Sequence, residues 1–391
     1  MIVIALGCVG VAPDTGGPTD SVAAPTDDSG GTDTQESGSD SDAETAVRPD
    51  SGESGGGTDS GVPIEPPLTV SDAEFVLVGS DVLNCSIGNP IVADWNGDGL
   101  LDLGATIYEG TTELGVRDGV AFRVNDLTVG TVETASISER FLGTGTSNGV
   151  QLDDAGDLDG DGYADALFQE RREDNSGRLA VLSGPFSGDV EFSDAAYSIY
   201  GEPDYPVAQI DSRVADVDGD GIPEILAAGY STLGGTTYGV GALSVYPGTG
   251  SGDHDASEAK AWVGCATEDD CWGFAWSLAV ADNNGDGIDD VWTAAYAAND
   301  YAGRVYVFEG PFEGGRTEAD ADVLRTGDPG SMYGEAMTVA DVDGDGDVDL
   351  AVLAGSDDSY QENAAAVYVE SGPLDRKSTR PELQSPCNLV C

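Results

Sequence analysis

The nine residues Asp341–Asp349 read DVDGDGDVD, in which five aspartates stand beside two glycines. Near copies begin at Asp94 (DWNGDGLLD), Asp157 (DLDGDGYAD), Asp216 (DVDGDGIPE) and Asp282 (DNNGDGIDD), so the starts are 63, 59, 66 and 59 residues apart. We number these segments loops 1 to 5 in chain order. A regular period of this length indicates a repeat architecture, and it takes precedence over any local reading of secondary structure.

Each repeat also contains apolar segments that are typical of β-strands. A short apolar run precedes the acidic loop, as in SLAVA (277–281), and another follows it, as in LAVLAG (350–355). Later in the repeats come alternating stretches that end in Gly-Pro or Pro-Gly: RLAVLSGPF (178–186), ALSVYPG (242–248), RVYVFEGPF (304–312) and AVYVESGPL (366–374). Period-two patterning beside such turns predicts strands. Several strands per repeat, with no amphipathic helix, predict an all-β β-propeller whose blades have about four antiparallel strands.

The charge balance excludes some classes of partner. The chain of 391 residues has 73 acidic and 15 basic side chains and a formal net charge of −58. Binding to the phosphate backbone of nucleic acids requires clustered Lys and Arg, and so does binding to anionic membrane surfaces. We therefore expect no nucleic-acid partner, and contact with a membrane only through a lipid anchor.

Composition divides the chain into four segments. Residues 1–8, MIVIALGC, resemble the end of a bacterial lipoprotein signal, which would make Cys8 the lipid-modified residue; accidental resemblance is the alternative. Residues 9–67 are rich in Gly, Ser, Thr, Asp and Pro and are expected to form a disordered acidic linker. Residues 68–374 contain the repeats. Residues 375–391 have no glycine and resemble a translated sequencing adapter; a genuine tail is the alternative.

The six cysteines do not form one framework. Cys265 and Cys271 bracket the residues ATEDD and are expected to form a disulfide if the protein is exported; two free thiols are the alternative. Cys85 is solitary, and its role is not assigned. With a single histidine, His254, the chain lacks the ligands of a zinc site, and His254 is expected to be an exposed loop residue rather than a catalyst.

The loops share the form D-x-[DN]-x-D-G-x-x-[DE], which suits calcium. Ca²⁺ takes six to eight oxygen ligands in irregular geometry, whereas Mg²⁺ demands a near-octahedral arrangement. Side chains at positions 1, 3, 5 and 9 can supply oxygens, and glycine at position 6 allows a sharp turn that brings in the carbonyl of position 7. An EF-hand would need a glutamate at position 12, where this chain has residues such as Ala105 and Phe168. A metal-free acidic turn could explain one copy more easily than five.

The predicted ligand set therefore covers up to five calcium ions. It comprises Asp94, Asn96, Asp98, Leu100 and Asp102 in loop 1; Asp157, Asp159, Asp161, Tyr163 and Asp165 in loop 2; Asp216, Asp218, Asp220, Ile222 and Glu224 in loop 3; Asp282, Asn284, Asp286, Ile288 and Asp290 in loop 4; and Asp341, Asp343, Asp345, Asp347 and Asp349 in loop 5.

The loop and its flanks resemble the FG-GAP repeat of integrin-α-type (VCBS-like) β-propellers and their bacterial relatives. The resemblance rests on YGEAMTVADVDGDGDVDLAVLAG (333–355) and WGFAWSLAVADNNGDGIDDVWTAA (272–295). It implies a ring of about seven blades, of which five would be visible here. The repeats depart from the pattern where Glu224 replaces the final aspartate, and where Asn96 and Asn284 replace aspartates.

These features favour a calcium-stabilised binding module at the cell surface over other functions. We expect an anchored lipoprotein or a secreted protein, outside the cytoplasm, that recognises an unidentified protein or glycan and is not an enzyme. A carbohydrate-active enzyme and a spacer for a further C-terminal module are the alternatives. Trp262, Trp272, Trp276 and Trp292 crowd into the fourth repeat and are expected to pack within the blade, with Trp272 and the Cys265–Cys271 loop as a candidate contact site.

Overall fold

The computed structural model describes residues 75–78, 86–108, 120–124, 130–143, 147–172, 176–201, 207, 210–229, 241–265, 271–356 and 365–374. All of them belong to one of the two compact units into which the chain divides, the one that contains residues 73–391. Cys8, Cys85, the expected linker and the segment 375–391 lie outside the described residues. No helix in the described part of the chain is long and apolar enough to cross a bilayer.

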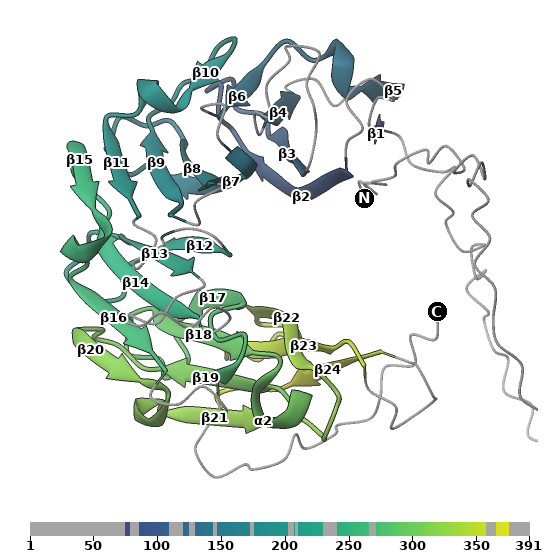
Figure 1. Cartoon of the computed structure of the whole chain (residues 1–391), viewed down its shortest axis with the longest axis vertical. Helices are drawn as coiled ribbons and strands as arrows, with labels where there is room; N and C mark the ends of the chain where they lie inside the picture. The colour runs from purple at the N-terminus through teal and green to yellow at the C-terminus, as the bar shows by residue number, and fades with distance from the viewer. Residues whose placement is uncertain are drawn as a thin grey trace, which may run out of the picture. The chain divides into compact units, whose positions relative to one another are not determined.

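Five sheets follow one another along the chain in a five-bladed propeller arrangement, which confirms the all-β prediction (Figure 1). Blade 1 contains β2 (Ser86–Ala93), β3 (Asp102–Tyr108), β4 (Val120–Val124) and β6 (Arg140–Leu142), and blade 2 contains β7 (Ser147–Gly156), β8 (Asp165–Arg172), β9 (Arg178–Leu182) and β11 (Tyr197–Tyr200). Blade 3 contains β12 (Ser212–Ala215), β13 (Glu224–Gly229), β14 (Ala242–Pro247) and β16 (Ala261–Gly264), and blade 4 contains β17 (Ser277–Ala281), β18 (Asp290–Ala295), β19 (Arg304–Phe308) and β21 (Val323–Thr326). Blade 5 contains β22 (Tyr333–Ala340), β23 (Asp349–Ala354) and β24 (Ala366–Glu370). Neighbouring strands within each of these sets pair antiparallel, and the first strands of the blades contact one another in chain order.

A further set of strands joins each blade to the next repeat. We call these the lacing strands: β5 (Gly130–Glu133), β10 (Val190–Glu191), β15 (Gly252–Asp255) and β20 (Gly314–Thr317). Strand β10 pairs in parallel with β6, β15 with β11, and β20 with β16, so the fourth strand of one blade is bonded to the repeat that follows. Strand β5 pairs with β1 (Phe75–Val78) in the same way. The sequence predicted blades of about four strands, and the lacing strands β10, β15 and β20 add a fifth to blades 1 to 3.

Helical structure in the described residues is confined to single turns. A short 3-10 turn follows each lacing strand: η2 (Thr134–Ser136), η3 (Phe192–Asp194), η4 (Ala256–Glu258) and η5 (Glu318–Asp320). The α-helix α2 (Ala298–Tyr301) lies between β18 and β19. The four 3-10 turns, unlike α2, return the chain from a lacing strand to the fourth strand of its own blade.

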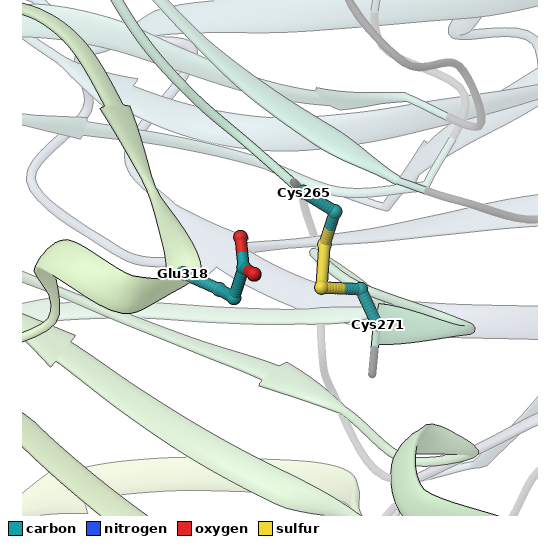
Figure 2. Close-up of side chains that lie close together, drawn as sticks. All are labelled: Cys265, Cys271 and Glu318. Carbon is teal, nitrogen blue, oxygen red and sulfur yellow. A yellow bond between two sulfur atoms is a disulfide. The ribbon is translucent and has the colours of Figure 1, made fainter. Parts of the chain in front are cut away.

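A disulfide closes the connection between blades 3 and 4. The sulfur atoms of Cys265 and Cys271 are 2.15 Å apart, directly after β16 and ahead of β17. The carboxylate of Glu318 lies beside them (Figure 2). Because bonded sulfurs are not thiolates, this group of three side chains is not a metal site of the kind that cysteine forms.

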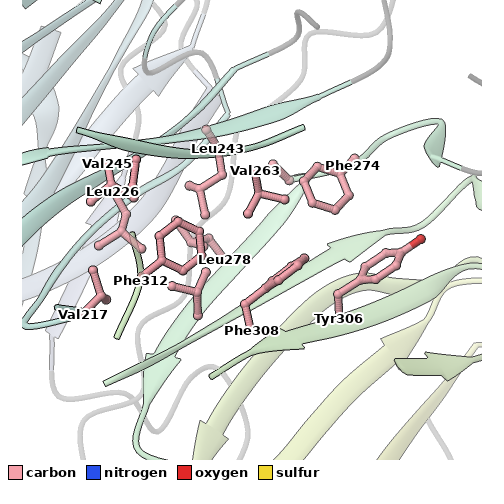
Figure 3. Close-up of a cluster of buried hydrophobic side chains, with 14 of the residues drawn as sticks. Val217, Leu226, Leu243, Val245, Val263, Phe274, Leu278, Tyr306, Phe308 and Phe312 are labelled. Carbon is pink, nitrogen blue, oxygen red and sulfur yellow. The ribbon is translucent and has the colours of Figure 1, made fainter. Parts of the chain in front are cut away.

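The hydrophobic core lies between the blades rather than at one centre. Figure 3 shows the cluster between blades 3 and 4, where Leu226 and Leu243 from blade 3 face Phe308 from blade 4. Along β13, alternate residues belong to different clusters: Ile225 packs toward blade 2 and Leu226 toward blade 4. Both faces of the strand are buried, which is why its sequence is a continuous apolar run instead of an alternating one.

The tryptophans fall into different environments, and one expectation about them is wrong. Trp262 lies on β16 of blade 3, where its ring covers Gly315 of the lacing strand β20, and not in blade 4. Trp292 is completely buried in blade 4 and donates a hydrogen bond to the Ala281 carbonyl. Trp272 is 42% exposed beside the disulfide, which leaves its indole accessible.

Candidate metal sites

Each acidic loop connects the first and second strands of a blade, so all five occupy equivalent places in the fold. The residue before position 1 pairs with position 9 across the hairpin, as Ala281 does with Asp290 and Ala340 with Asp349. Pairing stops there, and the intervening backbone amides need other acceptors. The loop side chains provide them.

The aspartate at position 1 organises the turn. In loop 5 the Asp341 carboxylate accepts hydrogen bonds from the amides of Gly344 (2.6 Å) and Gly346 (3.1 Å). Loops 1, 3 and 4 have the same pair of bonds, and loop 2 has the bond to position 6. One carboxylate thus gathers amides from both glycines of the loop.

Glycine is required at two positions of each loop. The φ angles at Gly344 and Gly346 are 83° and 96°, in the region that side chains disfavour. The equivalent glycines of the other four loops have φ between 75° and 94°. The motif predicted a role for the glycine of position 6; the equal role of the glycine at position 4 was not predicted, although both recur in all five copies.

The acid at position 9 is buried and braces two parts of its blade. Asp349 accepts the Val342 amide (2.8 Å) within the loop and the Gly372 amide (2.8 Å) from the turn after the third strand. Asp165 and Asp290 make the same two contacts, with Gly184 and Gly310 as the partners in the turn. The position-9 residues are at most 2% exposed. The Gly-Pro turns of the sequence therefore end beside the loops.

Burial and hydrogen bonding act in opposite directions on the pKa values of the position-9 acids. Burial raises the pKa of Asp165, Glu224 and Asp102, although the Arg123 guanidinium and the Trp95 amide oppose the rise at Asp102. Burial raises the pKa of Asp290 to about 6. At Asp349, burial acts in the same direction, but the hydrogen bonds from Gly372, Val342 and Asp343 outweigh it and lower the pKa. A bound cation would favour the ionised form of all these groups.

Positions 1, 3 and 9 converge in three of the loops. In loop 2, carboxylate oxygens of Asp157, Asp159 and Asp165 lie within 4.8 Å of one another. The same distance limit holds in loop 3 for Asp216, Asp218 and Glu224, and in loop 5 for Asp341, Asp343 and Asp349. Two oxygens that each bind calcium at about 2.4 Å are at most about 4.8 Å apart. The separation of the oxygens in these sets is therefore compatible with a shared calcium ion.

The remaining predicted ligands are placed differently. The carboxylates at position 5 lie outside these groups, and those of Asp161 and Asp345 accept the amide of position 7. In loop 1, the Asn96 amide group donates to Asp98 and Asp102. In loop 4, Asn284 accepts the Asp286 amide. At position 7, where the predicted ligand is the backbone carbonyl, the side chains of Leu100, Tyr163 and Ile222 are exposed.

Loop 3 differs from the other described loops in that its acids form salt bridges. The Lys260 ammonium lies 2.6 Å from an oxygen of Asp218 and 2.6 Å from an oxygen of Glu224. This pairing lowers the pKa of Asp218, whereas burial outweighs it and raises the pKa of Glu224.

Comparison with known proteins connects blade 4 to a repeat family. Residues 274–308 match the family model for the FG-GAP repeat. The chain contains an FG-GAP repeat. The matched FG-GAP segment covers β17, loop 4, β18 and β19, and the other four loops occupy equivalent positions in their blades. No curated protein matches the sequence.

Solved structures resemble this chain only distantly. The V. cholerae biofilm matrix protein Bap1 is 19% identical over 80% of this chain and 43% of its own, with a TM-score of 0.38. The rhamnogalacturonan lyase YesW is 14% identical over 74% of this chain and 52% of its own, with a TM-score of 0.38. A GH43 β-xylosidase/α-arabinofuranosidase from a compost metagenome is 10% identical over 78% and 97%, with a TM-score of 0.34. The chain thus spans about half the length of Bap1 and of YesW, and none of these likenesses bears on its function.

Proposed function

We propose that this chain is a calcium-stabilised β-propeller that acts outside the cytoplasm as an adhesion or ligand-binding module. The observation that carries the proposal is the convergence of the carboxylates at positions 1, 3 and 9 in equivalent loops. Like charges gathered so closely repel one another, and a hard divalent cation removes that repulsion. Calcium would therefore act on the stability of the blades rather than on a reaction.

The proposed location and partner follow from other features. A disulfide between Cys265 and Cys271 is typical of an oxidising compartment. A lipid anchor at Cys8 would hold such a module at the cell surface, and a secreted form would serve the same role without it. The partner is a protein or a glycan, for which the exposed Trp272 beside the disulfide offers an aromatic contact.

The proposal assigns no catalytic residue. His254, the single histidine, lies on the lacing strand β15, where it pairs with Glu258 at 3.0 Å and packs against Tyr197. These contacts support a structural role for its imidazole. An enzyme or a spacer for another module remains the competing function, and assays of purified protein on glycosides, glycans and matrix proteins separate the three.

Thermal unfolding with and without calcium tests the role of the metal. We expect EDTA to lower the melting temperature by about 10 °C and excess Ca²⁺ to restore it, because an ion that binds only the folded state adds its binding free energy to stability. Mg²⁺ should restore less of the loss, since it keeps its waters. A melting curve that EDTA leaves unchanged would contradict the proposal.

A further inference from the structure

Lys260 reaches the acidic loop of its own blade from a distant part of the sequence. It stands between η4 and β16, and its backbone amide donates to the Val245 carbonyl of β14 at 2.9 Å. From this anchored position the side chain extends to loop 3, where its ammonium contacts Asp218 and Glu224. These are positions 3 and 9, two of the three residues whose oxygens converge in this loop.

The equivalent residues of neighbouring blades bring no positive charge. Asp322 of blade 4 has the same backbone anchor, its amide donating to the Val307 carbonyl of β19. Its carboxylate accepts the Glu309 amide. In blade 2 the residue before the fourth strand is Ala196. Among the described residues, Asp218 and Glu224 are the only loop acids that form a salt bridge.

Glu224 is also the one glutamate at position 9, and its extra methylene is used for this contact. One oxygen of Glu224 accepts the Val217 amide at 3.2 Å, as the aspartates of the other loops do within their own turns. The other oxygen contacts Lys260. In loops 2, 4 and 5 the corresponding oxygen accepts a glycine amide from the Gly-Pro turn.

We propose that the Lys260 ammonium takes the place of a metal ion in loop 3, so that calcium binds at other loops of the chain but not at this one. The inference rests on the proposed calcium binding of the propeller. A lysine ammonium is a compact point charge with three donors and no acceptor, which suits two converging carboxylates. A calcium ion at loop 3 would have to displace it from both. Blade 3 would then be held together at any calcium concentration.

The number of calcium ions bound to the full-length protein tests the proposal, measured by equilibrium dialysis with radioactive calcium. Asp218→Ala should leave the number unchanged, because loop 3 holds Lys260 instead of a metal. Asp343→Ala, the matched change at position 3 of loop 5, should lower it by one. A loss of one ion in Asp218→Ala would overturn the inference.

Removing the ammonium gives the complementary test. Lys260→Met keeps the length of the side chain without its charge and should raise the number of bound calcium ions by one. Adding Asp218→Ala to Lys260→Met should cancel the gain. If the unchanged protein binds calcium and Lys260→Met gains none, the inference fails alone. If the unchanged protein binds no calcium, the proposed function fails with it.

Discussion

At the scale of single residues, acids that look alike in the sequence have different roles. Asp347 and Asp349 stand two residues apart in the same loop. Asp347 is exposed, whereas Asp349 is 1% exposed and accepts three backbone hydrogen bonds. The motif predicted that both residues bind the metal ion, Asp349 through its carboxylate and Asp347 through its backbone carbonyl. The brace from Asp349 to the Gly372 turn gives position 9 a structural role that exists without any ion.

Replacing these two residues separates the structural role from that of calcium. In EDTA, Asp349→Ala should lower the free energy of unfolding by about 2 kcal/mol, because the partly buried amides of Val342 and Gly372 lose their acceptor. Asp347→Ala should change it by less than about 0.5 kcal/mol, as exposed substitutions usually do. Urea unfolding measures both. Equal losses for the two variants would show that the brace has no separate contribution.

At the scale of elements, the first strands of blades 2 and 3 meet in a polar seam. The Asp153 carboxylate on β7 accepts hydrogen bonds from Gln169 (2.6 Å) and from Ser212 on β12 (3.0 Å). Asp211, just before β12, pairs with Arg213 at 2.5 Å. Burial raises the pKa of Asp211 to about 7; Arg213 lowers it, and Asp153 raises it further. The seam thus contains an acid whose charge changes near neutral pH.

The seam predicts a specific pH dependence. Because the folded-state pKa of Asp211 lies above its unfolded value, the folded state holds this proton more tightly, and the stability that results is lost as pH rises through about 7. Asp211→Asn should therefore gain stability relative to the unchanged protein, by on the order of 2 kcal/mol, between pH 5 and pH 8. Urea unfolding of both proteins across this range, in EDTA, provides the comparison. A constant difference would contradict the assignment.

Some of the strands could be predicted from the sequence, and others could not. The acidic loops, their hairpin strands and the third strands were predictable, since charge spacing and apolar alternation report them directly. The lacing strands were not, because GTVE, GDHD and GGRT have no buried alternating face, and their pairing is set by the backbone of another blade. The contact of Lys260 with loop 3 could not be predicted for a related reason. The residues next to Lys260 in the sequence give no sign of it, and Glu224, the nearer of the two acids that it contacts, is 36 residues away.

At the scale of the whole molecule, loops 1, 3 and 4 are each bonded to the next blade. The residue at position 2 provides the contact: the Phe186 amide donates to the Trp95 carbonyl, and the Phe312 amide donates to the Val217 carbonyl. Asn283 exchanges two hydrogen bonds with Leu374, at 3.0 and 3.1 Å. The turn that receives each contact is held by the position-9 acid of its own blade. Ordering one loop therefore orders the surroundings of its neighbour.

This linkage predicts that calcium binds with positive cooperativity. A calorimetric titration should give a Hill coefficient above one, because an ion at loop 5 fixes Asp349, and with it the turn that contacts loop 4. Asn283→Ala removes the contact between Asn283 and Leu374 without changing any candidate ligand. It should lower the Hill coefficient while the number of bound ions stays the same. Independent binding in the unchanged protein would contradict the linkage.

The lacing strands have a consequence for how such a chain can lengthen. Repeats 2 to 4 each contribute four strands to their own blade and one strand to the blade before it, so the sequence repeat and the structural blade are offset. Inserting one more repeat of this kind by tandem duplication would still supply the added strand to the blade before it. The architecture can therefore lengthen by copying a whole repeat, because each copy brings the fifth strand of the preceding sheet.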